Sequence, residues 1–520
     1  MPALPVVPTA SVIESGRSLR APLRESVDVV IIGSGAGGGM VAREVSRAGL
    51  RVMVLEEGGN HTPASFTQRE GDMLPRLFYD SGGRSTDDGG VLILSGRGIG
   101  GSTVHNTNLC KRAPDAILER WVSEHGARGW GPQDLDADYR AVEADLHVSA
   151  LTEEDVNVNN AILRRGVEKL GWRGALLHHN RVGCQKSGFC ELGCAYNAKE
   201  NAAKILIPEA LGNGARVYSD IRVTEIWTQG EKALGVRGHT LTNDGQPGEL
   251  VTVQAKAVCL SASAIGSAAL VRKSDIVDPH KLAGRSLRLH PGVAVAGRFR
   301  DRVDAWRGIP QSYECTEKLS FEPGAADRSW ILTAFAHPGG FAALQPGFGA
   351  ALTGAMRSYA QTAVVAAMLH DETEGEVRLG KAGRPLLRYQ MTDDDARALW
   401  RGAHACGEIL LAAGAQEVLV PLARPLVART VAGLAPLLTH RYRPLDPLLT
   451  AVHPMGTLAL GRDPSRSVVD PEGRHHRVAN VYVVDGSLFP TSLGGPPQIS
   501  IYTAGRKVAR TVVADLRRGP

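Results

Sequence analysis

The most regular pattern of apolar positions lies near the start of the chain. Residues 27–32 form a continuous β-branched run, which is typical of a strand buried on both faces. A glycine-rich loop at 33–38 follows, and apolar residues then recur at helical spacing from 40 to 48. A second apolar run at 51–55 ends at Glu56. This order predicts a strand, a helix and a second strand, as in the opening unit of a dinucleotide-binding fold.

The glycine loop gives this unit its candidate chemistry. Gly33, Gly35 and Gly38 would let the backbone approach a pyrophosphate at the helix N-terminus, where free N–H groups and the helix dipole favour anions. Glu56 would accept hydrogen bonds from the adenosine ribose hydroxyls. The alternative is a glycine-rich turn without a ligand, and the loop alone does not separate FAD from NAD.

Length and the later patterns indicate a second domain. A chain of 520 residues is too long for one simple core, so two domains are expected. Residues 375–379 and 385–389 have the alternation of short strands, and 394–413 has helical spacing. Two apolar segments, 330–356 and 426–438, fit either ordinary core or a lid for a lipophilic substrate that also touches a membrane surface.

Composition narrows the class of protein. Hydrophobic residues make up 43% and charged residues 22%, which is the balance of a globular protein and excludes wholesale disorder. The 59 Lys and Arg against 54 Asp and Glu are too balanced and too scattered to favour nucleic-acid binding. No secretory leader and no membrane-spanning run is recognised, so we expect a cytoplasmic protein whose seven cysteines are mostly thiols.

A second glycine-rich loop, residues 96–103 with Asn106, is more than an NAD dehydrogenase needs. At this point the chain resembles the glucose–methanol–choline (GMC) oxidoreductases, in which such a loop runs along the FAD pyrophosphate and under the isoalloxazine ring. Residues 258–271, 284–291 and 453–502 are similar to further motifs in the family's order. The resemblance is strongest to the long-chain alcohol oxidase and cholesterol oxidase-like branch.

The resemblance implies FAD as the cofactor and an α/β fold. It predicts a Rossmann-like FAD-binding domain and a second, α+β substrate domain built on an antiparallel sheet. Residues 25–115, 181–300 and 451–520 are expected to form the FAD-binding domain, with the cysteine-rich loop in its second part. Residues 116–180 would belong to the substrate domain or connect the two domains, and 301–450 would form the substrate domain.

The family's pattern also assigns cofactor contacts to residues of this chain. Asp485 and Gly486 match positions that contact the phosphate–ribityl part of FAD. Val223 matches a strand position whose backbone contacts the adenine, although a plain core strand explains it nearly as well. The remaining cofactor candidates are Gly96, Gly100, Gly101, Ser102, Asn106 and Gln498.

His453 is the candidate catalytic residue. Oxidation of an alcohol by a flavin needs a base for the hydroxyl proton, and an imidazole titrates near neutrality. His453 opens a His-x-x-Gly-Thr pattern at the position that the family uses for this base, whereas an isolated histidine is more often hydrogen-bonded core. The family's second His or Asn falls here on Pro496, which has no polar side chain. Either Gln498 replaces it, or other groups orient the substrate, or the chemistry differs or is absent; Asn106 and His105 are further candidates for lining the site.

Cys184, Cys190 and Cys194 lie within eleven residues. Their spacing is similar to that of the flavin subunits of sugar dehydrogenases that carry a three-iron cluster, but also to a cluster-free loop beside the flavin in long-chain alcohol oxidases. We favour the loop and expect no metal, because no fourth cysteine lies nearby.

The prediction is therefore an FAD-dependent enzyme that oxidises the CH–OH group of a small, apolar alcohol. Two alternatives are the flavin subunit of a sugar or polyol dehydrogenase with an iron–sulfur cluster, and a flavin-binding protein that has lost alcohol chemistry. The pattern does not distinguish oxygen from another electron acceptor.

Overall fold

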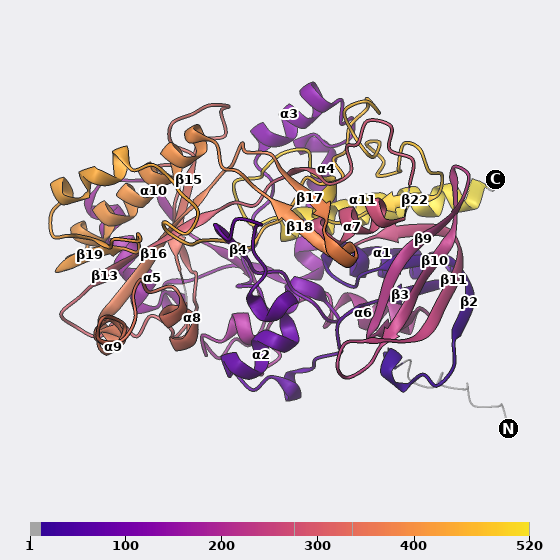
Figure 1. Cartoon of the computed structure of the whole chain (residues 1–520), viewed down its shortest axis with the longest axis horizontal. Helices are drawn as coiled ribbons and strands as arrows, with labels where there is room; N and C mark the ends of the chain where they lie inside the picture. Colours follow the sequence, from indigo (N-terminus) through magenta and orange to yellow (C-terminus); the bar gives the residue numbers. More distant parts are fainter. Residues whose placement is uncertain (1–11, 275, 335, 519–520) are drawn as a thin grey trace.

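The computed structural model describes residues 12–274, 276–334 and 336–518. Two large sheets lie at opposite ends of the long axis of the molecule, and a small sheet lies between them (Figure 1). No helix of the described residues has the length and apolarity that crossing a bilayer requires.

The first large sheet contains the predicted opening unit. Its strand order is β1-β8-β3-β2-β11-β10-β9, and β22 also pairs with β11. The pairings from β1 to β11 and that of β22 are parallel, whereas β10 pairs antiparallel with both of its neighbours. The strands are β1 (Glu14–Ser15), β2 (Leu23–Ile32), β3 (Val52–Leu55), β8 (Arg216–Ser219), β9 (Ile221–Gln229), β10 (Lys232–Leu241), β11 (Pro247–Leu260) and β22 (Val481–Val483).

The second large sheet is antiparallel apart from one pairing. Its order is β20-β19-β13-β16-β15-β14-β6; β21 pairs with β13 and, in parallel, with β4. The strands are β4 (Val91–Ile93), β6 (Gly174–Leu176), β13 (Gly292–Arg298), β14 (Tyr313–Cys315), β15 (Ser329–Thr333), β16 (Thr362–Leu369), β19 (Glu417–Val420), β20 (Leu426–Ala428) and β21 (Leu449–Ala451). The predicted α/β class with an antiparallel second sheet is therefore confirmed.

The remaining strands form two small sheets. The predicted strands 375–379 and 385–389 form β17 (Gly375–Leu379) and β18 (Pro385–Arg388), which pair with β12 (Arg285–Leu287) in a separate three-stranded sheet. The other small sheet joins β5 (Val148–Ala150) to β7 (His178–Asn180). Because β4, β6 and β13 lie outside 301–450 and still join the nine-stranded sheet, each domain draws on distant segments of the chain.

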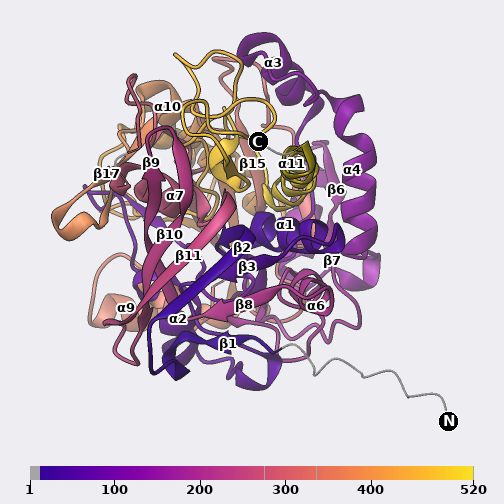
Figure 2. The ribbon, with the colours of Figure 1, turned by 90° about the vertical axis from the view of Figure 1, so that its right-hand side faces the viewer.

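Helices cover both large sheets. α1 packs against α6 and α11 beside the first sheet, and α10 packs on β13 and β16 of the second (Figure 2 shows α1 and α11 end-on). The predicted helix 394–413 corresponds to α10 within one residue at each end. The helices are α1 (Ala36–Arg47), α2 (Glu70–Leu77), α3 (Asp115–His125), α4 (Pro132–Asp145), α5 (Val158–Lys169), α6 (Leu206–Gly212), α7 (Ser263–Lys273), α8 (Pro338–Ala343), α9 (Ala350–Arg357), α10 (Asp393–Ala412) and α11 (Gln498–Arg518).

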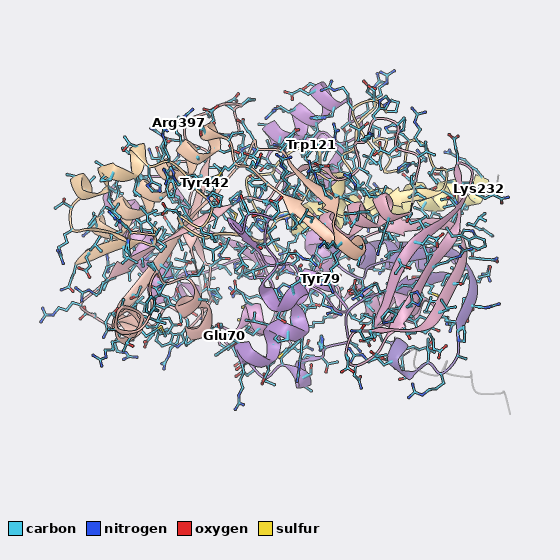
Figure 3. The ribbon with its side chains drawn as sticks, in the orientation of Figure 1. Glu70, Tyr79, Trp121, Lys232, Arg397 and Tyr442 are labelled. Carbon is cyan, nitrogen blue, oxygen red and sulfur yellow. The ribbon has the colours of Figure 1, made fainter. Side chains whose placement is uncertain are left out.

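The apolar segment 330–356 forms a buried strand followed by two more exposed helices. Its first part is the buried strand β15, which belongs to the core. Its second part forms α8 and α9, where α9 buries no residue and Phe348 between the helices is 90% exposed. Glu70 of α2, labelled in Figure 3, fixes this part by accepting hydrogen bonds of 2.7 Å from the N–H groups of Gly339 and Gly340. A lid or membrane contact here stays a prediction.

Candidate functional site

The turn between β2 and α1 is packed so tightly that several of its glycines are required by the fold itself. Gly33 has a φ of +94°, and a Cβ there would lie 2.2 Å from the carbonyl oxygen of Ser261. A Cβ on Gly38 would lie 2.0 Å from the carbonyl oxygen of Gly33, and one on Gly37 would lie 1.7 Å from that of Val484. The loop therefore packs against the residues that directly follow β11 and β22.

Gly35 differs from these residues because a Cβ there would make only an ordinary van der Waals contact. The nearest atom would be the Cα of Gly101, 4.0 Å away. Gly35 is also the N-cap residue of the 12-residue helix α1, whose first free N–H groups lie at this point. A helix N-terminus at a glycine loop fits an anionic group such as the pyrophosphate of FAD.

The second glycine loop is held against the first by two polar side chains. The Gly100 N–H donates to the Ser34 hydroxyl oxygen at 3.0 Å, and the Gly98 N–H donates to Glu56 Oε1 at 3.1 Å. Within the loop, the Gly96 N–H donates to the Ser102 hydroxyl oxygen at 2.9 Å. The predicted residues of the two loops are thus brought together.

Glu56 is 5% exposed and already has four donors from the protein. Oε2 accepts from the backbone N–H and the hydroxyl of Ser34, at 3.1 and 2.8 Å. Oε1 accepts from the N–H groups of Gly58 and Gly98, at 2.9 and 3.1 Å. Its burial raises the pKa of this carboxyl group. Glu56 therefore holds the two loops together, and ribose hydroxyls would share a carboxylate that is already hydrogen-bonded.

Three further cofactor candidates are fixed by contacts within the chain. Val223 lies near the start of β9, which is anchored to the loop at 56–58 by the hydrogen bond from the Ile221 N–H to the Glu56 carbonyl oxygen, 2.9 Å. Asn106 Nδ2 donates to Gln498 Oε1 at 2.8 Å, and Gln498 Nε2 donates to the Leu109 carbonyl oxygen at 2.6 Å. Both polar atoms of the Gln498 amide are thus hydrogen-bonded within the protein.

The C-terminal segment that carries Asp485 packs on α7. Asp485 Oδ2 accepts from the Ser267 hydroxyl at 2.5 Å, and Oδ1 accepts from the Ser487 N–H at 2.9 Å. Burial raises the pKa of Asp485. The carbonyl oxygen of Gly486 accepts from the Gly456 N–H at 3.1 Å, so this segment also holds the His-x-x-Gly-Thr loop.

Thr457 ends that loop and is fully buried. Its hydroxyl donates to the Ala264 carbonyl oxygen at 2.6 Å. We expect Thr457→Val to lower the free energy of unfolding by about 1 kcal/mol, because it removes a buried hydrogen bond and places a methyl group against that carbonyl oxygen. Thr353→Val, which removes an exposed bond of the same kind to the Gly349 carbonyl oxygen, should change it by less than about 0.5 kcal/mol. Urea unfolding would measure both, and equal effects would contradict this account.

His453 lies opposite a second histidine, His290. An antiparallel bridge pairs Arg288 with Met455 through two backbone hydrogen bonds of 2.9 and 3.0 Å. In such a pairing the residues two positions farther on face each other, so residue 290 lies opposite residue 453. The two Nδ1 atoms are 3.2 Å apart, and the rings meet edge to face.

His290 is held in place from both sides. Its φ is +53°, a strained value for a non-glycine residue, and Asp371 stabilises it by accepting from the backbone N–H groups of Leu289 and His290, at 2.9 and 3.3 Å. Its Nε2 accepts from the Gly494 N–H at 2.9 Å. Burial lowers the pKa of His290 to about 3, and burial together with His290 lowers the pKa of His453 well below 6.5, so both rings are neutral.

A cavity of about 390 Å³ lies next to His290, although neither histidine lines it. Gly494, whose N–H bonds His290, lines it together with Pro496, Leu493, Leu319 and Phe321. Three cations also line it, and each has an acidic partner: Lys111 with Glu314, Arg112 with Asp136 and Glu143, and Arg173 with Glu317. The cavity is therefore lined by apolar side chains and by cations whose charges are balanced by acidic partners.

The three clustered cysteines line a different, smaller cavity together with Arg181 and Lys199. All three are free thiols. Among the described residues, no group of three or more His, Cys, Asp or Glu side chains is arranged to hold a metal ion.

His290 is the main residue of this site to which the sequence analysis assigns no role, although the motif that contains it was recognised. His105, in contrast, lies beneath the second glycine loop, 4.0 Å from Phe78 between ring centroids, and its Nε2 has no hydrogen-bond partner among the described residues. It packs in the core and does not line the cavity.

Comparison with known families and sequences gives consistent matches. The GMC oxidoreductase family models match residues 74–292 and 371–505, and an FAD binding domain model matches residues 28–67. An uncharacterised GMC-type oxidoreductase of Mycobacterium tuberculosis is 35% identical over 503 residues, which cover 96% of this chain and 78% of that protein. A long-chain-alcohol oxidase of Arabidopsis thaliana is 27% identical over 97% of this chain and 71% of its own length.

Solved structures share the fold at low sequence identity. Pyridoxine 4-oxidase from Mesorbium loti has a TM-score of 0.69 and 19% identity, with 93% of this chain and 98% of that chain covered. A formate oxidase variant from Aspergillus oryzae has a TM-score of 0.68 and 15% identity, with 95% and 99% covered.

Proposed function

Because this chain belongs to the GMC oxidoreductase family and carries an FAD-binding domain, we propose that it oxidises an apolar alcohol to an aldehyde or ketone at His453. The observation that carries the proposal is the position of His453. It lies opposite a buried, fixed histidine whose other partner, Gly494, lines a cavity large enough for a small-molecule substrate.

The residues proposed to hold FAD fit that cofactor. The N-terminus of α1 beside Gly35 would take the pyrophosphate, and the Asp485–Gly486 segment follows β22, whose neighbour in the sheet is β11. Bound FAD would supply the acceptor for the hydride that leaves the alcohol carbon. The full proposed set is Gly33, Gly35, Gly38, Glu56, Gly96, Gly100, Gly101, Ser102, Asn106, Val223, Asp485, Gly486 and Gln498.

His453 would contact the reacting hydroxyl group. The sequence predicts that it acts as a general base, and a neutral ring is what such a base requires at neutral pH. Pro496, at the position of the family's second His or Asn, lines the cavity and offers no hydrogen bond to a substrate. Since the Gln498 amide is engaged with Asn106 and Leu109, it does not replace that residue.

An apolar alcohol is the substrate class that the cavity and the relatives favour. Leu319, Phe321, Leu493 and Pro496 give the cavity an apolar wall, and its cations are neutralised by acidic partners. Relatives that are 25–27% identical over most of this chain are long-chain-alcohol oxidases. We therefore expect the apolar body of the alcohol to lie in this cavity, with its hydroxyl group directed towards His453.

Anaerobic titration with a panel of alcohols would test the proposal. We expect long-chain or steroid alcohols to bleach the flavin absorption of the holoenzyme, and glucose and polyols to bleach it at least about tenfold more slowly, because burial of apolar surface drives binding. Preferred bleaching by sugars, with iron and acid-labile sulfide in the protein, would support the sugar dehydrogenase alternative. An intact flavin with every alcohol would mean that alcohol chemistry has been lost.

A further inference from the structure

The positions of the protons on His290 and His453 follow from one fixed donor. The Gly494 backbone N–H can only donate, and it points at Nε2 of His290. Nε2 of His290 is therefore unprotonated, and the neutral ring carries its proton on Nδ1. That N–H faces Nδ1 of His453 at 3.2 Å, so Nδ1 of His453 is the acceptor.

We propose that His290 is a positioning residue that fixes the tautomer of His453, so that His453 presents an Nε2–H donor to the alcohol oxygen. A neutral imidazole whose Nδ1 accepts a hydrogen bond carries its proton on Nε2. Among the described residues Nε2 of His453 has no hydrogen-bond partner, and the side chain is only partly buried. This inference rests on the proposed function and changes only the step in which His453 takes part.

The opposite tautomer is disfavoured by the same contacts. A base at Nε2 of His453 would need its proton on Nδ1, and this N–H would have to donate to Nδ1 of His290. His290 would then carry its proton on Nε2, directed at the Gly494 N–H 2.9 Å away. Two donors would face each other in a buried site, where an unmade hydrogen bond is costly.

Gly494 and His290 have little freedom to avoid this conflict. Gly494 has a φ of +65°, and a Cβ there would lie 2.8 Å from Phe321 and 3.2 Å from His370, so its backbone is enclosed. His290 is fully buried, and Asp371 clamps its strained backbone. Tyr389 donates a third hydrogen bond to Asp371, at 2.8 Å. The contacts that orient the ring come from three separate parts of the chain.

In this arrangement the oxidation requires no proton transfer to or from His453. The hydroxyl O–H bond breaks as its proton passes to a hydroxide ion, which becomes water, and the electron pair stays on oxygen. Nε2–H of His453 donates to the resulting alkoxide in a charge-assisted hydrogen bond. The C–H bond breaks with its electron pair as hydride leaves for the flavin, and an oxygen lone pair completes the carbonyl group.

Nitrogen spectra of the holoenzyme labelled with ¹⁵N-histidine would test the tautomer without any substrate. We expect Nδ1 of His453 to be unprotonated and Nε2 to be protonated, with assignment by loss of the signals in His453→Gln. The reverse pattern would overturn the inference. Because this measurement needs no turnover, it decides the tautomer even if no alcohol reduces the flavin.

Two variants of His290 add a kinetic test. His290→Leu should slow flavin reduction by about 10- to 100-fold, because His453 is then free to adopt the tautomer without a donor. His290→Gln can accept from Gly494 and donate to His453, so it should recover at least about tenfold of that loss. His178→Gln, an exposed position, is the matched control. A rate that is unchanged or increased in His290→Leu would mean that His453 acts as the base, and the inference would fail while the proposed function stands.

Discussion

In the His453→Ala protein, we expect an alcohol to reduce the bound flavin at least about 100-fold more slowly than in the unchanged protein. The alanine removes the only side chain that we place at the reacting hydroxyl group. Pro496 offers no substitute, and the Gln498 amide is already hydrogen-bonded at both polar atoms. Stopped-flow absorption under anaerobic conditions would measure the rate. The flavin content should not change, because His453 is not among the residues proposed to hold FAD.

A second substitution at the same position separates two roles of the ring. His453→Gln keeps an N–H donor but has no basic nitrogen, so a rate well above that of His453→Ala favours donation to an alkoxide. Equal rates for the two variants would favour the general base. His178→Ala serves as the control, and a rate for His453→Ala within threefold of the unchanged protein would exclude His453 from the reaction.

The Gly35→Val protein should fold and yet bind FAD at least about 100-fold more weakly. Gly35 has φ and ψ of −68° and −159°, which valine can adopt, and a Cβ there meets only the Gly101 Cα at 4.0 Å. The added methyl groups would instead lie at the N-terminus of α1, where we propose that the pyrophosphate binds. Flavin fluorescence during titration with FAD would give the affinity, and circular dichroism would report the fold.

Two other glycines make this result specific. Gly37→Ala should damage the fold itself, because its Cβ would lie 1.7 Å from the Val484 carbonyl oxygen. Gly354→Val on α9, where a Cβ meets nothing within 4 Å, should affect neither folding nor FAD. If Gly35→Val bound FAD normally, the pyrophosphate would have to lie elsewhere.

Local patterns allowed the first sheet and the long helix to be predicted. The largely β-branched run at 27–32 is buried along its whole length because β2 lies between β3 and β11 and packs against α1. α10 was predictable because its apolar residues recur at helical spacing over 20 residues after Thr392, which caps its first turn. These features depend on residues close together in the chain.

The contacts of the site could not be predicted in the same way. His290 and His453 meet because Arg288 pairs with Met455, and these two histidines are 163 positions apart. The engagement of Glu56 with the glycine loops depends on Ser34 and Gly98, which only the folded chain brings to one carboxylate. Motifs indicated which residues matter, whereas the register between distant strands decides which atoms face each other.

The arrangement of β2, β11 and β22 sets when the protein can acquire its cofactor. These three strands are neighbours, yet they end at residues 32, 260 and 483. During synthesis the segment that closes the proposed FAD site leaves the ribosome about 450 residues after β2. Stable FAD binding would therefore wait for that segment, and retained flavin would mark molecules in which these distant strands have come together.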